Sequence, residues 1–238
     1  MIDTVLFDLD GTLLPMDQDQ FLELYMKALA KTFAPGGYDP KLLVSSVWKG
    51  TGAMVKNDGS MSNRERFWQV FSQAMGEDML EKETVFEDFY RNQFAEAKAA
   101  TGFQPLSGKV VRLLRSKGYT VALATNPLFP QVATLRRMGW AGLSPEDFDL
   151  VTTYEADTYC KPNLDYYRSV LERLGKEPGQ CMMVGNDVDE DMCTVELGLT
   201  GYLLTDCLLN RRGKPVEGFL SGSFEDFYRY AEELPELT

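Results

Sequence analysis

Short runs of consecutive apolar residues, each closed by polar or glycine-containing residues, recur along the chain. They occupy residues 5–7, 119–124, 181–184 and 202–204, with a weaker run at 150–153. Continuous apolarity, rather than alternation of apolar and polar positions, is typical of strands that are buried on both faces of a parallel sheet. We therefore expect these runs to form a parallel β-sheet.

Helical patterns lie between the later apolar runs. Residues 110–114 carry an apolar stripe, and four apolar residues between 164 and 174 recur at spacings of three and four before Gly175, a residue typical of helix ends. From about residue 105 the chain therefore alternates strands with helices. This alternation predicts an α/β fold with a parallel sheet.

The segment from about residue 17 to residue 100 has no convincing strand pattern. Its apolar side chains recur at helical spacing in three stretches, at residues 21–29, 67–74 and 85–94. A glycine- and asparagine-rich stretch at residues 50–60 is predicted to be a loop. A block of helices therefore separates the first strand from the rest of the sheet, which is the arrangement of an inserted domain.

Composition and charge narrow the classes of function. The chain has 238 residues, of which 44% are hydrophobic, so it can form a sizeable core. The 36 acidic residues exceed the 24 basic ones, giving a net charge of −12, so we expect no broad basic face for nucleic acid or anionic membranes. The absence of histidine excludes Ser-His-Asp and Cys-His catalysis, which leaves acid–base chemistry to carboxylates, lysine, tyrosine or cysteine.

The cysteine pattern and the start of the chain indicate a reducing compartment. Cys160, Cys181, Cys193 and Cys207 form no C-x-x-C pair, so we expect free thiols. The first residues lack the pattern of a signal peptide, and no apolar run approaches the length of a membrane span. We expect a cytoplasmic protein that acts as a monomer.

Polar side chains follow three of the predicted strands. Asp8 and Asp10 end one strand, Thr125 and Asn126 a second, and Asp187 a third. The carboxyl ends of neighbouring parallel strands meet at one edge of a sheet, where ligands bind in open α/β folds. Carboxylates that converge there repel each other unless a cation lies between them, and Mg²⁺ suits a site that must also accept a phosphate oxygen.

These residues belong to four motifs that occur in a fixed order. Residues 5–12 read as a hydrophobic strand followed by D-x-D-G-T, and residues 121–125 as a strand that ends in threonine. Lys161-Pro162 supplies a lysine before proline, and residues 184–187 supply a strand followed by glycine and an acid, with Asp191 four residues further on. In this set the chain resembles the haloacid dehalogenase superfamily of phosphotransferases, over nearly its whole length.

The resemblance implies a fold and a domain division. The fold would be a Rossmann-like parallel sheet core with an inserted α-helical cap domain, because the helical block resembles the C1-type cap of this family. The core would comprise residues 1–15 and 101–238, and the cap residues 16–100.

The resemblance also implies a mechanism, that of a Mg²⁺-dependent phosphatase acting on a small phosphorylated metabolite. Asp8 would be the nucleophile that forms an aspartyl-phosphate, and Asp10 the general acid and then the general base. Asp8, the backbone carbonyl of Asp10 and Asp187 would hold the Mg²⁺ ion. Thr125, Asn126 and Lys161 would bind the phosphoryl oxygens.

Three acidic residues near the fourth motif have less specific roles. Asp191 would bind the metal through water, fix Lys161 or favour a helix N-terminus by its charge. Asp189 and Glu190 are expected to form a solvated helix start.

The loop of the predicted cap holds our candidates for substrate specificity, Lys56 and Asn57. Both are polar and lie between helical stripes. A phosphomutase of the same family remains an alternative, as does a non-catalytic phosphate-binding regulatory protein. Phosphonate cleavage, which needs a cap lysine able to form a Schiff base, stays open through Lys56.

Overall fold

Six parallel strands form one sheet in the computed structural model, which describes residues 1–237. The order across the sheet is β3-β2-β1-β4-β5-β6. The strands are β1 (Thr4–Phe7), β2 (Thr120–Leu123), β3 (Leu150–Val151), β4 (Cys181–Gly185), β5 (Thr200–Leu204) and β6 (Leu220–Gly222). The predicted parallel α/β fold is confirmed. Strand β6 was not predicted, because its residues are largely exposed and form no apolar run.

Strand β1 lies at the centre of the sheet, where the strand order reverses. It pairs with β2 on one side and β4 on the other, and Phe7 is in register with both Leu123 and Val184. The three strands therefore end at the same level. In open α/β sheets such a reversal point is where the crevice for a ligand opens.

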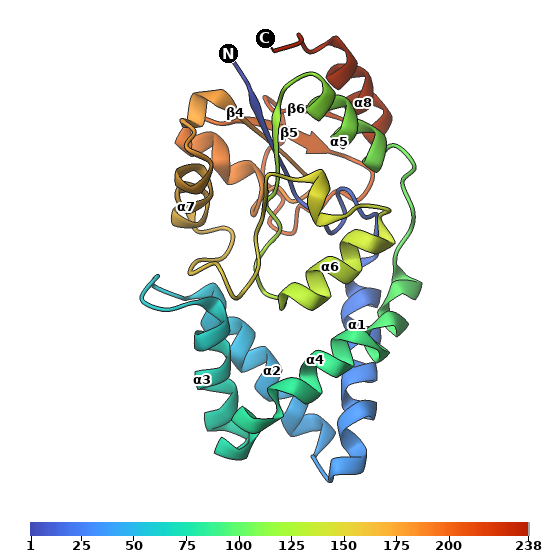
Figure 1. Cartoon of the computed structure of the whole chain (residues 1–238), viewed down its shortest axis with the longest axis vertical. Helices are drawn as coiled ribbons and strands as arrows, with labels where there is room; N and C mark the ends of the chain where they lie inside the picture. The colour runs from blue at the N-terminus through green and yellow to red at the C-terminus, as the bar shows by residue number, and fades with distance from the viewer. Residues whose placement is uncertain (238) are drawn as a thin grey trace.

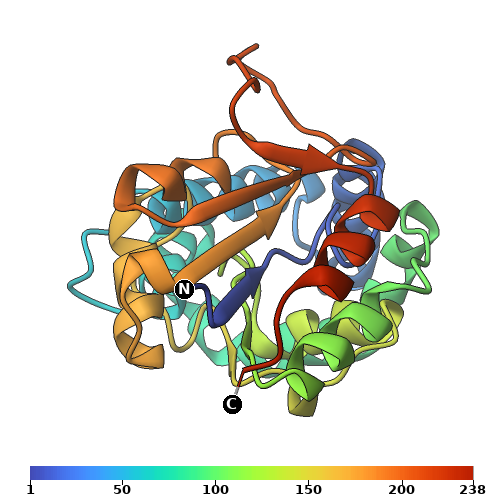
Figure 2. The ribbon, with the colours of Figure 1, turned by 90° about the horizontal axis from the view of Figure 1, so that it is seen from above.

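Helices cover both faces of the sheet (Figure 2). Val5 and Phe7 of β1 point to the face covered by α5 and α8, whereas Leu6 points to the face covered by α7. The helices of this part of the chain are α5 (Ser107–Ser116), α6 (Gln131–Trp140), α7 (Leu164–Leu174) and α8 (Phe224–Glu233). Short 3-10 helices are η4 (Pro145–Asp147), η5 (Pro178–Gln180) and η6 (Met192–Leu197).

The segment between β1 and α5 forms a helical block at the foot of the sheet (Figure 1). Its helices are α1 (Gln18–Phe33), α2 (Pro40–Val55), α3 (Asn63–Met75) and α4 (Glu83–Arg91), with 3-10 helices η1 (Ala34–Gly36), η2 (Glu77–Lys82) and η3 (Gln93–Ala100). Local capping sets two of the helix starts. Asp39 accepts hydrogen bonds from the first turn of α2 and Pro40 occupies its first position, while Ser62 and Glu65 form a capping box on α3.

The predicted loop at residues 50–60 is wrong for its first half, because α2 continues to Val55. Gly50 lies inside the helix, and a Cβ atom at this position would lie 2.6 Å from Cδ2 of Phe67 on α3. The glycine is therefore needed for the close approach of the two helices rather than for a turn. None of the helices within residues 1–237 is long and apolar enough to cross a membrane.

The two segments that connect the sheet with the helical block run side by side. Met16 and Thr101 form an antiparallel bridge, and the Gly102 N–H donates to the Pro15 carbonyl at 2.7 Å. The two connecting segments are therefore bonded to each other where they enter and leave the helical block. Any rotation of the block relative to the sheet would have its hinge there.

Candidate active site

A cavity of about 220 Å³ opens at the carboxyl ends of β1, β2 and β4 and extends into the helical block. The structure brings most of the predicted site residues to this cavity from widely separated parts of the chain. Those that line it are Asp8, Asp10, Thr125, Asn126, Asp187 and Asp191. Their convergence follows from the level ends of the three central strands.

Lys161 is fully buried between two carboxylates. Its Nζ lies 2.8 Å from Oδ1 of Asp8 and 2.7 Å from Oδ1 of Asp191. Burial disfavours the charged ammonium, but the charges of Asp191 and Asp8 outweigh this effect and hold the pKa of Lys161 well above its ordinary value. The side chain is therefore a permanent cation behind the nucleophile candidate, Asp8.

Asp191 contacts Lys161, which is one of the three roles considered for it from the sequence. Its second carboxylate oxygen, Oδ2, accepts a hydrogen bond from the Asp187 N–H at 3.0 Å. A Cβ atom on Gly185 would lie 2.1 Å from this oxygen, so glycine is required where the carboxylate packs against β4. Asp191 thus links Lys161 to the backbone of Asp187.

Asp10 faces the cavity but also forms an ion pair that the sequence did not predict. Its Oδ2 contacts Nη1 of Arg137, while its Oδ1 is buried without a hydrogen-bond partner. Arg137 is only 1% exposed, and its guanidinium lies 4.4 Å from the centre of the Phe129 ring. Burial lowers the pKa of Arg137 to about 10, against the effect of Asp8, so the side chain stays charged at neutral pH.

The signal for Arg137 in the sequence is its position on α6. It shares the buried face of the helix with Ala133, Thr134 and Met138, where an unpaired charge would be costly. A charged residue on an apolar stripe indicates a buried partner, but the periodicity alone does not identify that partner as Asp10.

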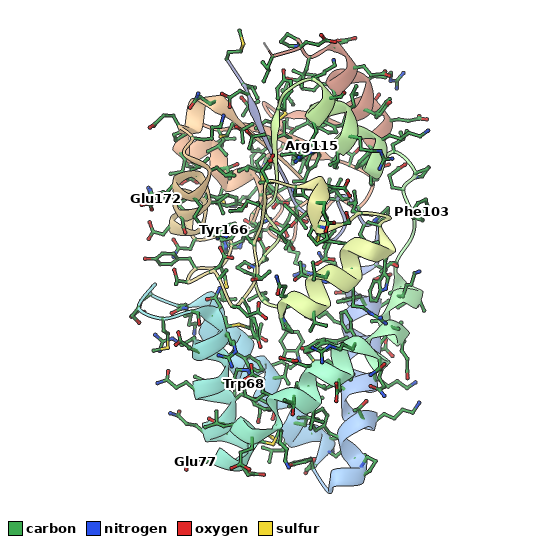
Figure 3. All side chains as sticks on the ribbon, viewed as in Figure 1. Trp68, Glu77, Phe103, Arg115, Tyr166 and Glu172 are labelled. Carbon is green, nitrogen blue, oxygen red and sulfur yellow. The ribbon has the colours of Figure 1, made fainter. Side chains whose placement is uncertain are left out.

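The segment after β2 is fixed by hydrogen bonds to its backbone and side chains. The Thr125 carbonyl accepts from the hydroxyl of Thr152 at 2.7 Å and from that of Tyr166 at 2.9 Å. Tyr166, labelled in Figure 3, comes from α7. The side chain of Asn126 accepts from the Lys161 N–H at 3.2 Å and donates to Glu190 at 3.0 Å. These bonds hold the second, third and fourth motifs at fixed positions around the cavity.

The expectation of a solvated helix start is wrong for Glu190. Its side chain lines the cavity, and burial raises its pKa to about 7. Oδ1 of Asp187 accepts the backbone N–H groups of Asp189 and Glu190, at 2.7 and 2.9 Å, which fixes the turn, and the Asn126 amide holds the Glu190 carboxylate on the inner side. Asp189 instead pairs with Lys214 at 2.6 Å.

Asn186 is a further cavity residue to which the sequence gave no role of its own. It is buried, accepts from the Thr12 hydroxyl at 3.0 Å and donates to the Cys207 carbonyl at 2.7 Å. These bonds join the loop after β4 to the turn that follows Asp10.

The carboxylates around the cavity fit a hard cation. Asp8, Asp10, Asp187 and Asp191 all line it, and these four aspartates outnumber the two buried cations beside them, Lys161 and Arg137. Within residues 1–237, no three His, Cys, Asp or Glu side chains come together as a metal cluster. Mg²⁺ commonly takes only one or two carboxylates and completes its shell with water and phosphate oxygens, so two of these carboxylates, such as Asp8 and Asp187, could supply its charged ligands.

Lys56 and Asn57 are not brought to the cavity. Lys56 is exposed at the C-terminal end of α2. Asn57 is buried, and its amide donates to the Met61 carbonyl and to Asn63, both at 2.9 Å, which shapes the loop between α2 and α3. The structure gives these residues a place in the fold of the loop and none in the lining of the cavity.

Comparisons with known proteins agree with the fold and identify a family. The family model described as haloacid dehalogenase-like hydrolase matches residues 2–192. The chain is 28% identical over 213 residues to glyceraldehyde 3-phosphate phosphatase of Methanothermobacter thermautotrophicus, covering 88% of this chain and 86% of the relative. It is 26% identical over 188 residues to phosphoglycolate phosphatase of Aquifex aeolicus, covering 79% and 77%. The crystal structure of a HAD phosphatase from Thermococcus onnurineus has the same fold, with a TM-score of 0.61 and 19% identity over 99% of this chain and all of that one.

Proposed function

Since the chain belongs to the haloacid dehalogenase-like hydrolases, we propose that it is a Mg²⁺-dependent phosphatase that hydrolyses a small phosphorylated metabolite through an aspartyl-phosphate. The observation that carries this proposal is the position of Asp8. Its carboxylate faces the cavity at the end of the central strand, with one oxygen bonded to Lys161. The names of the two similar phosphatases support the same reaction.

The reaction requires one nucleophile and one proton carrier. The Asp8 oxygen that is not bonded to Lys161 attacks phosphorus, and the bond to the leaving oxygen breaks as Asp10 gives that oxygen a proton. Asp10 then accepts a proton from water, and the water oxygen attacks phosphorus and releases Asp8 and inorganic phosphate. Asp10 enters the first step protonated on Oδ1, the oxygen without a hydrogen-bond partner, while Arg137 contacts Oδ2 and holds the side chain at the cavity wall.

Lys161 can both position Asp8 and bind the phosphoryl group. An ammonium has three N–H donors, and the contacts with Asp8 and Asp191 use two of them. The third would bind a phosphoryl oxygen beside Asp8, although Lys161 itself is buried and is not among the residues that line the cavity. The Thr125 hydroxyl and the Asn126 backbone N–H would bind the remaining oxygens at the end of β2.

The Mg²⁺ ion would be held by the carboxylates of Asp8 and Asp187 and by the backbone carbonyl of Asp10. The ion supplies positive charge between an anionic nucleophile and an anionic phosphoryl group. The bond from Asp191 to the Asp187 N–H keeps the turn that carries this ligand in place.

Residues 16–100 would act as the cap over a core of residues 1–15 and 101–238. All four helices of the block contribute side chains to the cavity, so a closed block excludes bulk water from the reacting groups. We further propose that the enzyme acts as a monomer in the cytoplasm, where its four free cysteines would stay reduced.

Release of phosphate from a chromogenic ester, measured with and without Mg²⁺, tests this function. We expect Mg²⁺-dependent release of inorganic phosphate and a loss of roughly 10⁴-fold or more in Asp8→Asn. A phosphomutase would release little inorganic phosphate from this ester and would instead convert a phosphorylated sugar into an isomeric phosphate ester. A phosphate-binding regulatory protein would bind phosphate without turnover, and either result would contradict the proposal.

A further inference from the structure

The part of the cavity that lies in the helical block, here called the cap chamber, has a wall of aromatic rings. Trp68 on α3, labelled in Figure 3, is one of them. The rings come from all four helices of the block and from the segments after β2 and β3, and they are Phe21, Tyr25, Trp48, Phe67, Trp68, Phe86, Tyr90, Phe129 and Tyr154. Met26 and Leu22 of α1 add aliphatic surface to the same wall.

The rings pack against one another and therefore form the wall without a ligand. The ring centres of Tyr25 and Phe129 are 5.5 Å apart, and those of Trp68 and Phe86 are 5.3 Å apart in an edge-to-face arrangement. The chamber is thus a largely preformed apolar site.

Four of these rings bond to each other through their polar atoms. The hydroxyl groups of Tyr25 and Tyr90 are 2.8 Å apart, and Nε1 of Trp68 donates to the Tyr154 hydroxyl at 3.4 Å. Burial raises the pKa of Tyr25 to about 12, so its phenol is neutral at physiological pH. In each pair one hydroxyl hydrogen remains available, so these bonded groups offer a ligand at most two neutral donors and no charge.

The charged residues of the chamber are also paired. Arg64 donates two hydrogen bonds to Glu83, and Arg91 lies 2.8 Å from Glu87. Of the described residues that line the cavity, Arg211 is the single lysine or arginine, and it is exposed on the segment that follows β5. The chamber therefore has no buried cation for a carboxylate and no unpaired acid for an amine.

Resting on the phosphatase function above, we propose that the cap chamber binds a neutral, apolar leaving group, so that the substrates are phosphate monoesters of aliphatic or aromatic alcohols. Burying a hydrocarbon chain against these rings is favourable in proportion to its area. A carboxylate would lose water there without gaining a buried cation, and sugar hydroxyls would find few partners beyond Gln18, Thr51 and the tyrosine hydroxyls, which is costly. This class differs from the phosphorylated acid and the phosphorylated aldehyde in the names of the two similar phosphatases.

A series of n-alkyl phosphates from ethyl to hexyl tests this proposal on the unmodified protein with Mg²⁺. The leaving alcohols have almost the same acidity, so differences in kcat/KM report contact with the chamber. We expect kcat/KM to rise by about fourfold for each methylene until the chamber is full, and butyl phosphate to exceed phosphoglycolate of similar size by roughly 100-fold. Turnover with a flat or falling series overturns this proposal alone, whereas no turnover of any ester overturns the phosphatase function and this proposal with it.

Phosphocholine and its neutral carbon isostere, dimethylbutyl phosphate, separate an apolar site from a cation-binding aromatic cage. Aromatic rings also attract quaternary ammonium groups, but the paired state of Glu83 and Glu87 favours the neutral compound. A higher kcat/KM for dimethylbutyl phosphate supports the proposal. A higher value for phosphocholine overturns it.

A matched pair of lysine substitutions on α1 tests where discrimination arises. Met26 lines the chamber and is half-buried, whereas Gln20 is exposed and does not line it. We expect Met26→Lys to lower kcat/KM for butyl phosphate by about tenfold or more and to raise it for phosphoglycolate, because the chamber then holds a cation. Gln20→Lys adds the same charge and should leave both values unchanged. Equal changes for the two substrates in Met26→Lys contradict the proposal, and the alkyl series decides independently if this variant does not fold.

Discussion

Arg137→Met should impair the proton transfer assigned to Asp10 while keeping the bulk of the buried side chain. The substitution removes the guanidinium that contacts Asp10 and lies over Phe129. A hydrogen bond between charged groups contributes about 1.5–3 kcal/mol, which corresponds to a loss of roughly 10- to 150-fold in kcat/KM if the pair holds Asp10 where it protonates the leaving oxygen. The same removal leaves a carboxylate without its partner, so we also expect a lower melting temperature.

The leaving group separates a catalytic effect from a general loss of folded protein. The value of kcat/KM reports the steps up to formation of the aspartyl-phosphate, in which Asp10 acts as an acid. An alkyl leaving group needs a proton, whereas para-nitrophenolate leaves readily without one. Arg137→Met should therefore lower kcat/KM strongly for an alkyl phosphate and by less than about fivefold for para-nitrophenyl phosphate.

A double-mutant cycle with Asp10→Asn measures the coupling between the two side chains. We expect the Arg137→Met substitution to have little further effect once Asp10 is replaced. Arg136→Met, at the half-buried neighbouring position on α6, is the matched control and should retain full activity. Equal losses on both substrates, or additive effects of Asp10→Asn and Arg137→Met, would refute the positioning role of Arg137.

Three further substitutions test the site at other points. Asp187→Asn should raise the Mg²⁺ concentration needed for half-maximal activity by more than about tenfold, measured by titration of the chelator-treated enzyme, since a charged ligand is lost; an unchanged requirement would remove Asp187 from the metal site. Asp191→Asn keeps an acceptor for the Asp187 N–H but removes a charge beside Lys161. Its kcat/KM should fall by roughly 10- to 100-fold, with a smaller change in the Mg²⁺ requirement than in Asp187→Asn. A larger change in the Mg²⁺ requirement than in Asp187→Asn would make Asp191 a metal ligand. Lys56→Ala should leave kcat/KM unchanged for every substrate, because the side chain is exposed outside the cavity; a loss confined to one metabolite would restore Lys56 as a specificity residue.

The sheet and the residues at its edge were predictable because their signals are local. A buried strand requires a continuous apolar run, and the residues that follow it are placed at the sheet edge by the strand itself. Asp8, Thr125 and Asp187 could therefore be placed together from three short stretches of sequence. Strand β6 lacks such a run, since its residues are largely exposed. It is defined by its pairing with β5, which the sequence pattern does not reveal.

The helical block was harder to predict because its contacts join distant residues. The glycine at position 50 indicates a loop locally, yet it permits the packing of Phe67 against α2. Lys56 and Asn57 were chosen as specificity residues for their polarity, whereas the residues that line the chamber are aromatic and are indistinguishable from core residues by periodicity alone. The same limit applies to Arg137, whose partner Asp10 is 127 positions away in the chain.

The central claim, that Asp8 carries the phosphoryl group during turnover, can be tested directly by acid quenching and peptide mass spectrometry. The enzyme is mixed with Mg²⁺ and a phosphate ester, quenched during steady-state turnover and digested under acidic conditions. We predict that the peptide containing Asp8 gains the mass of one phosphoryl group, and that Asp8→Asn yields no such adduct. A phosphoryl group on a different residue, with turnover retained in Asp8→Asn, would contradict the account.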